Sequence, residues 1–269
     1  HLEGLNEYFT FQNLLQENTL FQGIYLVPAG TVLWINEADR SLRRRVYWNF
    51  DFTHPLSSLT LEDTVEESIS RIERAVKRSL LSDAPLGGYL FADSIPNSLV
   101  SLASRYMPFL YTFTFGFHQP EISSGEPVND DRAEAEITAH TFKTEHYGMV
   151  ISSTDIQRSM PQVVYHLEDL RLGMSYHDYY LARLASKFVR VCLVPQGGNE
   201  LFAQYPWRYF HTLQKLGRDD YIRRYFDSYQ HLVSDPEKTK LFTDDIFRNI
   251  NPARPYELFR DIFLRSDSL

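Results

Sequence analysis

The chain has 269 residues, which is enough for one large domain or two modest ones. Its net charge of -8 argues against nucleic acid as a partner, because phosphate binding needs clustered Lys and Arg. The one basic cluster, at 40–45, is typical of a charged hairpin tip. The single cysteine, Cys192, excludes an internal disulfide, and its apolar neighbours predict an inert core thiol.

Location and processing are predicted from the same features. No stretch approaches the ~20 consecutive apolar residues of a membrane span, and no signal peptide is recognisable. We therefore expect a cytoplasmic protein without a membrane partner. Because the chain begins with His1 and not with Met, we also expect it to be a fragment or a processed piece.

The amino-terminal part, residues 1–55, is predicted to form a small β structure. A short helix is expected within 5–16. Pro and Gly then separate alternating, β-branched segments, which predict strands at 23–27, 31–36 and 45–50. Three strands alone make a poor core, so we expect this piece to pack on the rest of the chain or on a partner.

From 56 to 269 the pattern becomes one of alternating helices and strands. Apolar residues recur at helical spacing from Leu61 to Leu81, and Thr60 can cap that helix. Strands are then expected at 86–91, 111–117, 147–152 and 188–194, with helices at 98–106, 130–142, 154–168 and 175–187. This order predicts an α/β fold with a parallel sheet flanked by helices, in which ligands bind at the carboxyl ends of the strands.

The segment after the first of these strands is the main candidate for a site. Strand 86–91 leads through a tight loop, Ala92–Asn97, into a helix that opens near Ser98. Such a connection places backbone N–H groups and the positive end of the helix dipole at the edge of the sheet. The loop is therefore predicted to be able to bind an anion.

The sequence beyond Asn199 is helical and rich in aromatic residues, and its last helix is expected at 255–263. The expected role of these aromatic residues is core or lid packing. A stacking platform for bases and an assembly interface are the alternatives. The residues concerned are Tyr205, Trp207, Tyr209, Phe210, Tyr221, Tyr225, Phe226 and Tyr229.

Short motifs along the whole chain carry a family resemblance. The first three are LNEYFTFQN, TLFQGIYLVPAG and YWNFDF; the later ones are SDAPLGGYL with SLVSLASRY, TFTFGF, FKTEHYGMVIS, HLEDLR, LARLASKFVRV and GGNELFAQYPWRY. In this order and spacing, the chain resembles the glutamine-hydrolysing asparagine synthetase family from Leu5 to about Phe263.

The resemblance implies a domain organisation and a fold. Residues 1–55 would correspond to the end of the family's glutaminase domain. Residues 56–269 would correspond to its synthetase domain, with a helical carboxyl-terminal part. The family's synthetase fold is the adenine nucleotide alpha hydrolase-like, or ATP-pyrophosphatase, type, which agrees with the predicted parallel sheet.

The resemblance also implies ATP and Mg²⁺ as cofactors. In the family, a Ser-Gly-Gly-x-Asp-Ser loop holds pyrophosphate and carboxylates hold Mg²⁺, while a lysine stabilises charge as aspartate is adenylated and ammonia attacks the mixed anhydride. The nucleotide-binding positions carried over by resemblance are Leu90, Phe91, Ala92, Asp93, Ser94, Phe115, Val194, Pro195, Gly197 and Gly198. Asp93 and Glu200 are the candidate metal ligands, and no catalytic residue is identified.

The sequence departs from the family pattern at both loops. Residues 91–96 read Phe-Ala-Asp-Ser-Ile-Pro, so that both glycines are replaced, Ile95 stands at the position of the metal-binding aspartate and Pro96 lacks an N–H. In the second loop, 194–195 reads Val-Pro in place of Ser-Gly, and Asn199 replaces an aspartate. The segment that carries the family's catalytic lysine would follow the end of this sequence.

Three hypotheses for function result. In the first, the chain keeps the synthetase fold without competent ATP chemistry and acts by binding a small molecule or a paralogous protein. In the second, it is an active ATP-dependent amidotransferase or ligase that forms an amide through an acyl-adenylate, with Asp93, Ser94 and Glu200 in place of the lost groups. In the third, it is a non-catalytic assembly domain that would form a homo-oligomer or bind a partner, with the aromatic helices as its interface.

Overall fold

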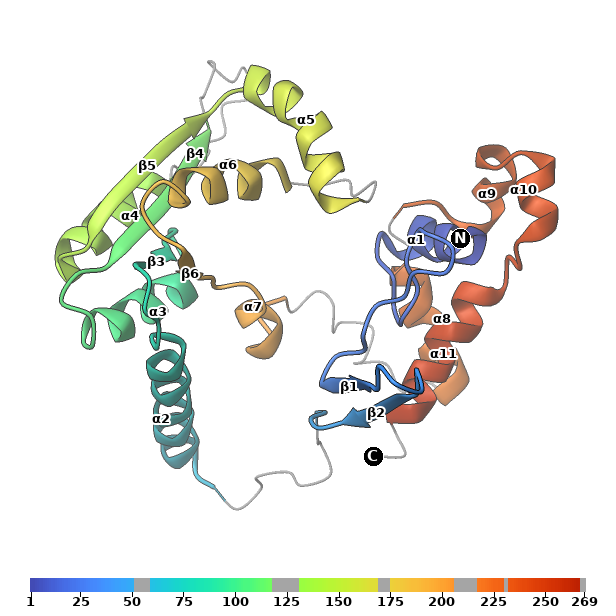
Figure 1. Ribbon diagram of the computed structural model, residues 1–269, viewed down its shortest axis with the longest axis horizontal. Helices are drawn as coiled ribbons and strands as arrows, with labels where there is room; N and C mark the ends of the chain where they lie inside the picture. Colours follow the sequence, from blue (N-terminus) through green and yellow to red (C-terminus); the bar gives the residue numbers. More distant parts are fainter. Residues whose placement is uncertain (51–58, 118–130, 169–174, 206–216, 230–231, 267–269) are drawn as a thin grey trace. The chain divides into compact units, whose positions relative to one another are not determined.

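A computed structural model describes residues 1–50, 59–117, 131–168, 175–205, 217–229 and 232–266 (Figure 1). The chain forms two compact units, which we describe one at a time. Unit 1 comprises His1–Ser57 and Trp207–Leu269, and unit 2 comprises Ser58–Pro206. None of the helices among these described residues is both long and apolar enough to cross a membrane.

Unit 2 is built on a four-stranded parallel sheet. Its strands are β3 (Leu86–Tyr89), β4 (Tyr111–Phe117), β5 (Glu145–Ile151) and β6 (Val191–Leu193), in the order β5-β4-β3-β6. Every neighbouring pair is parallel. The predicted α/β class with a parallel sheet flanked by helices is confirmed, as is a separate, small antiparallel piece, described below with unit 1.

Helices cover both faces of the sheet, as a parallel sheet requires. Helices α3 and α4 contact one face and α6 contacts the other, while α2 packs on α3 and α5 packs on α6. These helices are α2 (Leu61–Ser79), α3 (Ser94–Ser104), α4 (Asp131–Phe142), α5 (Ser153–Leu167) and α6 (Ser175–Ala185).

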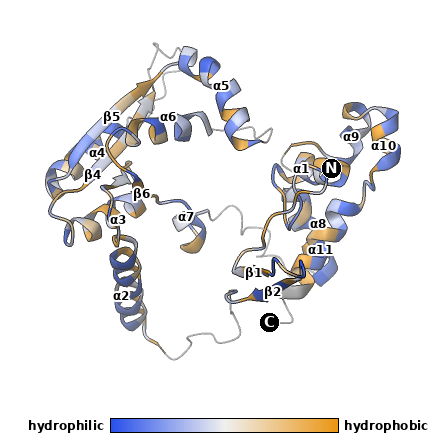
Figure 2. Ribbon diagram, in the orientation of Figure 1, coloured by the Kyte–Doolittle hydropathy of each residue, from blue (hydrophilic) through white to orange (hydrophobic). Residues whose placement is uncertain are grey.

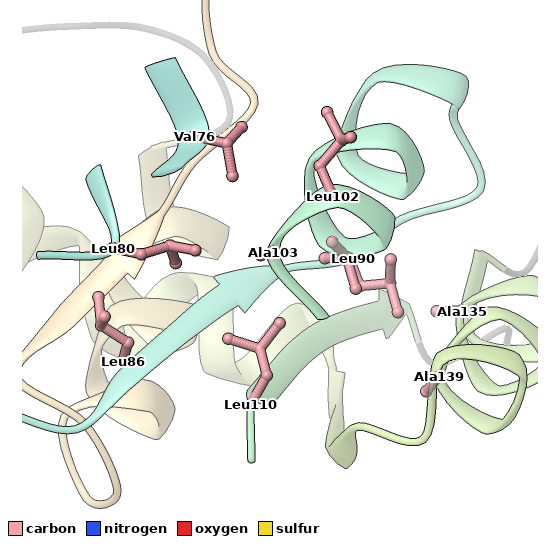
Figure 3. Close-up of a cluster of buried hydrophobic side chains, with 10 residues drawn as sticks. Val76, Leu80, Leu86, Leu90, Leu102, Ala103, Leu110, Ala135 and Ala139 are labelled. Carbon is pink, nitrogen blue, oxygen red and sulfur yellow. The ribbon is translucent and has the colours of Figure 1, made fainter. Parts of the chain in front are cut away.

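The core under α3 and α4 is aliphatic (Figure 3). Leu86, at the start of β3, and Leu90, just after its end, point to this side and are almost completely buried. Alanines of α3 and α4, such as Ala103 and Ala135, let these helices approach the sheet closely. Alternate residues of β3 therefore contribute to different faces, which explains the continuous apolar pattern of the strand.

The opposite face of the sheet is aromatic. Phe113 of β4 is fully buried and packs with Leu181 of α6. The rings of Tyr147 and Phe188 stack nearby, with centroids 4.0 Å apart. A Cβ on Gly87 would lie 2.7 Å from the Phe113 ring, so glycine is needed where this ring crosses β3.

Helix α2 begins where the sequence predicts. Thr60 accepts a hydrogen bond from the Asp63 N–H, and the Asp63 carboxylate accepts one from the Thr60 N–H, which completes a capping box. Val76 near the end of α2 is buried, whereas Val65 and Ile69 of its first half are exposed. Figure 2 accordingly shows α2 as largely hydrophilic.

Two boundaries in unit 2 differ from the prediction by more than two residues. Helix α3 begins at Ser94 and not near Ser98, because Asp93 acts as its N-cap and Pro96 occupies the third helical position, where an N–H is not needed for the helix. Strand β6 is limited to Val191–Leu193, because Phe188 and Val189 still hydrogen-bond back to Ala185 at the end of α6.

Unit 1 joins the two ends of the chain. Phe11 of α1 packs with Ile222, Phe226 and Phe259. The Asn6 side chain also donates to the Asn251 carbonyl at 2.9 Å. The helices of this unit are α1 (Leu2–Phe11), α8 (Arg218–Tyr229), α9 (Asp235–Leu241), α10 (Asp244–Asn249) and α11 (Arg254–Ser266). Core packing is confirmed for the aromatic residues of α8, whereas Trp207, Tyr209 and Phe210 lie outside the described residues.

The antiparallel piece is a hairpin of β1 (Thr31–Ile35) and β2 (Leu42–Val46). The predicted strand at 23–27 is wrong, because that segment forms only an isolated bridge between Asn18 and Tyr25. The last predicted strand lies about three residues earlier than expected, since the Asn36 and Asp39 side chains accept backbone N–H groups and close the turn.

A buried cation ties α9 to α1. The Lys238 side chain has no exposed surface, and its Nζ donates to Thr10 Oγ1 at 2.6 Å and to Asp235 Oδ1 at 2.7 Å. A buried ammonium group is tolerated only when it is paired and hydrogen-bonded. Asp235 and Thr10 therefore stabilise the packing of the two ends of the chain.

Gly87→Ala should destabilise unit 2. The added methyl group meets the Phe113 ring, which neighbouring rings hold in place, and we expect the free energy of unfolding to fall by about 1–3 kcal/mol. Gly148→Ala is the matched control, since its Cβ would lie 3.5 Å from Thr114 Cγ2, an ordinary contact. Urea denaturation followed by circular dichroism measures both, and equal curves for the two variants would contradict the proposed close packing.

Asp235→Asn should loosen the contact between α9 and α1. The buried Lys238 ammonium group loses its counter-charge, and we expect local stability to fall by about 1–3 kcal/mol. Hydrogen exchange of peptides that cover 1–15 and 235–245 measures the change. Asp261→Asn removes an exposed carboxylate of α11 and should leave the exchange of these peptides unaltered. Identical exchange in the two variants would show that the Lys238 pair is unimportant.

Candidate functional site

A pocket of about 480 Å³ lies in unit 2 at the carboxyl ends of the strands. Phe91, Asp93 and Pro96 line it from the segment after β3, and Pro195, Gln196 and Gly197 line it from the segment after β6. This is the edge at which parallel α/β sheets bind ligands. The candidate anion loop and the second family loop therefore meet at one pocket.

The first loop carries its own carboxylate, Asp93, at the amino-terminal end of α3. The Asp93 carboxylate accepts from the Ser94 hydroxyl at 3.3 Å and, over a long 3.5 Å, from the Ile95 N–H. Pro96 is buried and carries no N–H. The amino-terminal end of a helix attracts phosphate groups. In α3 this position is already occupied by the negative charge of Asp93.

The two loops touch through Ile95 and Gly198. A Cβ on Gly198 would lie 2.6 Å from Ile95 Cγ2 and 2.7 Å from Ile95 Cδ1. Gly197, just before it, has a φ of +91° and is the N-cap residue of α7 (Gly198–Leu201). A branched apolar side chain therefore packs directly on the backbone of the second loop.

One wall of the pocket is aromatic. The rings of Phe91 and Phe115 meet edge to face with centroids 5.5 Å apart, and His177 stacks on Phe115 at 4.7 Å with an interplanar angle of 18°. His177 Nδ1 lies 3.2 Å from Asp178 Oδ1. Helix α6 thus contributes both a ring and a carboxylate to the pocket.

Carboxylates reach the pocket from four elements. Asp93 precedes α3, Asp131 begins α4, Asp178 lies in α6 and Glu200 lies in α7. None of the described residues that line the pocket is Lys or Arg. Across the described parts of the chain, no three His, Cys, Asp or Glu side chains gather in a way that could hold a metal ion. The pocket is acidic, and its carboxylates are dispersed.

The neutral residue Asn199 completes the second loop. Its Nδ2 donates to the Tyr205 hydroxyl at 3.3 Å, and both residues line the pocket.

His146 lies outside this pocket, on the face of the sheet opposite the aromatic residues. Its Nδ1 lies 2.9 Å from Thr112 Oγ1, and burial lowers the pKa of His146.

Comparison with known proteins identifies the family. A family model for asparagine synthase matches residues 68–260, more than half of the chain. The chain belongs to the asparagine synthase family. It is 29% identical over 205 residues to the glutamine-hydrolyzing asparagine synthetase 1 of Bacillus subtilis (strain 168). The matched residues make up 76% of this chain and 31% of that relative.

A second relative matches along more of the chain. The glutamine-hydrolyzing asparagine synthetase 3 of the same strain is 26% identical over 262 residues, or 92% of this chain and 39% of the relative. The chain thus spans about a third of the length of these curated relatives. The family resemblance predicted from the sequence motifs is confirmed.

The pocket gathers part of the set of nucleotide-binding positions carried over from the family. Those that line it are Phe91, Asp93, Phe115, Pro195 and Gly197, together with the candidate metal ligand Glu200. Those that do not line it are Leu90, Ala92, Ser94, Val194 and Gly198. Leu90 points into the core under α3, and Gly198 is covered by Ile95. The assignment of the lining residues to a nucleotide stays a prediction.

Sequence reasoning missed the contribution of α6. His177 and Asp178 line the pocket, although spacing alone gave no reason to select them. The available signal was their place in the first turn of the helix that leads into β6. Asp131, at the start of α4, also lines the pocket and was not selected as a site residue from the sequence. Asp169 and Arg171 of the HLEDLR motif lie outside the described residues.

Cys192 lies in β6, opposite Gly87 of β3, and is only half-buried. Burial nevertheless raises the pKa of the Cys192 thiol to about 11. Burial, with Cys192 and Asp178 nearby, also raises the pKa of Tyr89 to about 12. Both groups stay neutral at pH 7, which supports the prediction of an inert thiol.

Cys192 should react slowly with iodoacetamide in the folded protein. A thiol with a pKa of about 11 holds roughly a hundredfold less thiolate at pH 8 than an unfolded thiol with a pKa of about 8.5. We expect the folded rate to be lower by about that factor and to rise about tenfold per pH unit up to pH 10. Mass spectrometry in buffer and in urea measures the rates, with Cys192→Ser as the blank. Similar rates in both solvents would contradict a protected thiol.

Proposed function

We propose that this chain keeps the scaffold of the asparagine synthase family but does not hold Mg-ATP, so that it acts by binding and not by catalysis. The contact of Ile95 with Gly198 is the observation that carries this proposal. The family resemblance assigns a metal-binding aspartate to the position of Ile95. An apolar side chain there supplies no oxygen ligand, and it occupies the space between the two loops.

The charge of the pocket supports the same conclusion. A triphosphate needs cationic partners, yet the described lining residues include four carboxylates and neither Lys nor Arg. Each lost charge-assisted hydrogen bond costs about 1.5–3 kcal/mol, so the loss of three removes on the order of 6 kcal/mol, or about four decades of affinity.

The residues present do not fit magnesium either. Mg²⁺ requires oxygen ligands at close to octahedral geometry. Asn199 replaces a carboxylate, and its amide donates to Tyr205. Asp93 caps α3, while Glu200 is exposed in the first turn of α7. The candidate metal ligands Asp93 and Glu200 therefore have other roles.

The ligand of such a scaffold is a small molecule or a paralogous protein. Fold persistence does not depend on the lost phosphate contacts, because the core of unit 2 is aliphatic on one face and aromatic on the other. We retain the cytoplasm as the proposed location. An active ligase with Asp93, Ser94 and Glu200 in substitute roles is the opposing outcome of the experiment below.

Assembly is a second candidate function, favoured by the exposed apolar side chains of residues 21–50. The aromatic residues of α8 cannot serve as the interface, because they pack inside unit 1. Large apolar side chains that gather on an exposed surface are characteristic of interaction sites. The exposed side chains include Phe21, Tyr25, Trp34, Ile35, Tyr47 and Trp48. Homo-oligomer formation remains a proposal that light scattering can test.

Calorimetric titration with Mg-ATP tests the main proposal. We expect no magnesium-dependent heat at millimolar ATP and no AMP when aspartate or glutamate is added, because the described residues of the pocket include no set of metal ligands and neither Lys nor Arg. An unfolding curve in the same buffer is the control that unit 2 is folded. Micromolar, magnesium-dependent binding together with release of AMP would replace the proposal with an active ligase.

A further inference from the structure

We propose that the unit 2 pocket binds an organic cation, namely a primary ammonium group attached to an aromatic body. This inference rests on the proposed function in one respect: Mg-ATP must not already occupy the pocket. Three features carry it: the size of the pocket, its aromatic wall, and its carboxylates placed on separate elements.

The size of the pocket matches a small ligand. Its volume of about 480 Å³ falls within the range of small-molecule sites. It lies at the ends of β3, β4 and β6, on a sheet whose two faces are fully packed. The loops that line the pocket therefore leave directly from the strands of a packed sheet.

The aromatic wall favours a cation with a planar body. Phe91 and Phe115 meet edge to face, and the imidazole of His177 stacks on Phe115, so that three rings line this side of the pocket. An ammonium group over an aromatic face is attracted by the ring quadrupole, and an aromatic ligand ring can add a stacking contact. Aliphatic ligands would gain less from this wall.

The carboxylates supply the matching charge. Asp178 lies beside His177, and its side chain is 53% exposed. Asp131 and Glu200 reach the same pocket from α4 and α7. In a concave site, charges of one sign raise the local concentration of oppositely charged ligands. Since no three donors converge on a metal position within the described residues, an organic ammonium ion fits better than an inorganic ion.

A pair of probes with opposite charge tests the proposal. Phenethylammonium and 3-phenylpropionate share a ring and a similar length, and calorimetry or ligand-observed NMR at pH 7 and low salt measures their binding to the full chain. We expect phenethylammonium to bind at least about tenfold more tightly than the acid, and to weaken as salt rises from about 20 mM to about 200 mM.

Two variants locate the binding. Asp178→Asn should weaken phenethylammonium about threefold to tenfold, because it removes the pocket carboxylate next to the aromatic wall. Asp83→Asn is the matched control, since Asp83 is an exposed carboxylate before β3 that does not line the pocket. Phe115→Leu should also weaken binding, provided that its unfolding curve matches that of the parent.

The outcomes are distinguishable. Equal binding of the two probes, no binding of phenethylammonium, or equal effects of Asp178→Asn and Asp83→Asn would each overturn the inference. If neither probe nor Mg-ATP binds, the inference fails and the proposed function stands. If Mg-ATP binds and displaces phenethylammonium, both the inference and the proposed function fail, because the inference requires that Mg-ATP does not occupy the pocket.

Discussion

The packing of Ile95 on the backbone of Gly198 is the constraint on which the candidate site depends. It joins the loop after β3 to the loop after β6 and fixes both at the carboxyl edge of the sheet. Glycine is required at 198, because any Cβ there would overlap the isoleucine side chain. An apolar contact thus stands at a position where the family resemblance implies a metal-binding carboxylate.

The electrostatics of the pocket follow from this substitution. Among the described residues, the lining of the pocket carries the carboxylates of Asp93, Asp131, Asp178 and Glu200 and neither Lys nor Arg. The side chains that line the pocket, and not the fold, therefore decide whether the scaffold would bind an anionic nucleotide or a cation.

The two ends of the chain are held together by a different kind of interaction. In unit 1, the aromatic core around Phe226 supplies apolar burial, and the buried Lys238 supplies a directional tie between α9 and α1. A buried ammonium group gains little net stability, but it penalises packings in which Asp235 and Thr10 are misplaced. We therefore regard this pair as a specificity device for joining distant segments.

Local pattern in the sequence determined much of the fold of unit 2. Helical spacing and the Thr60 cap predicted α2, and alternation of strands with helices predicted the parallel sheet. The motif order predicted the family. Only the tertiary structure decided that Ile95 meets Gly198, that Asp178 joins Asp93 and that Lys238 meets Thr10. Those residues are far apart along the chain, and periodicity reports which face a residue occupies but not which distant residue it meets there.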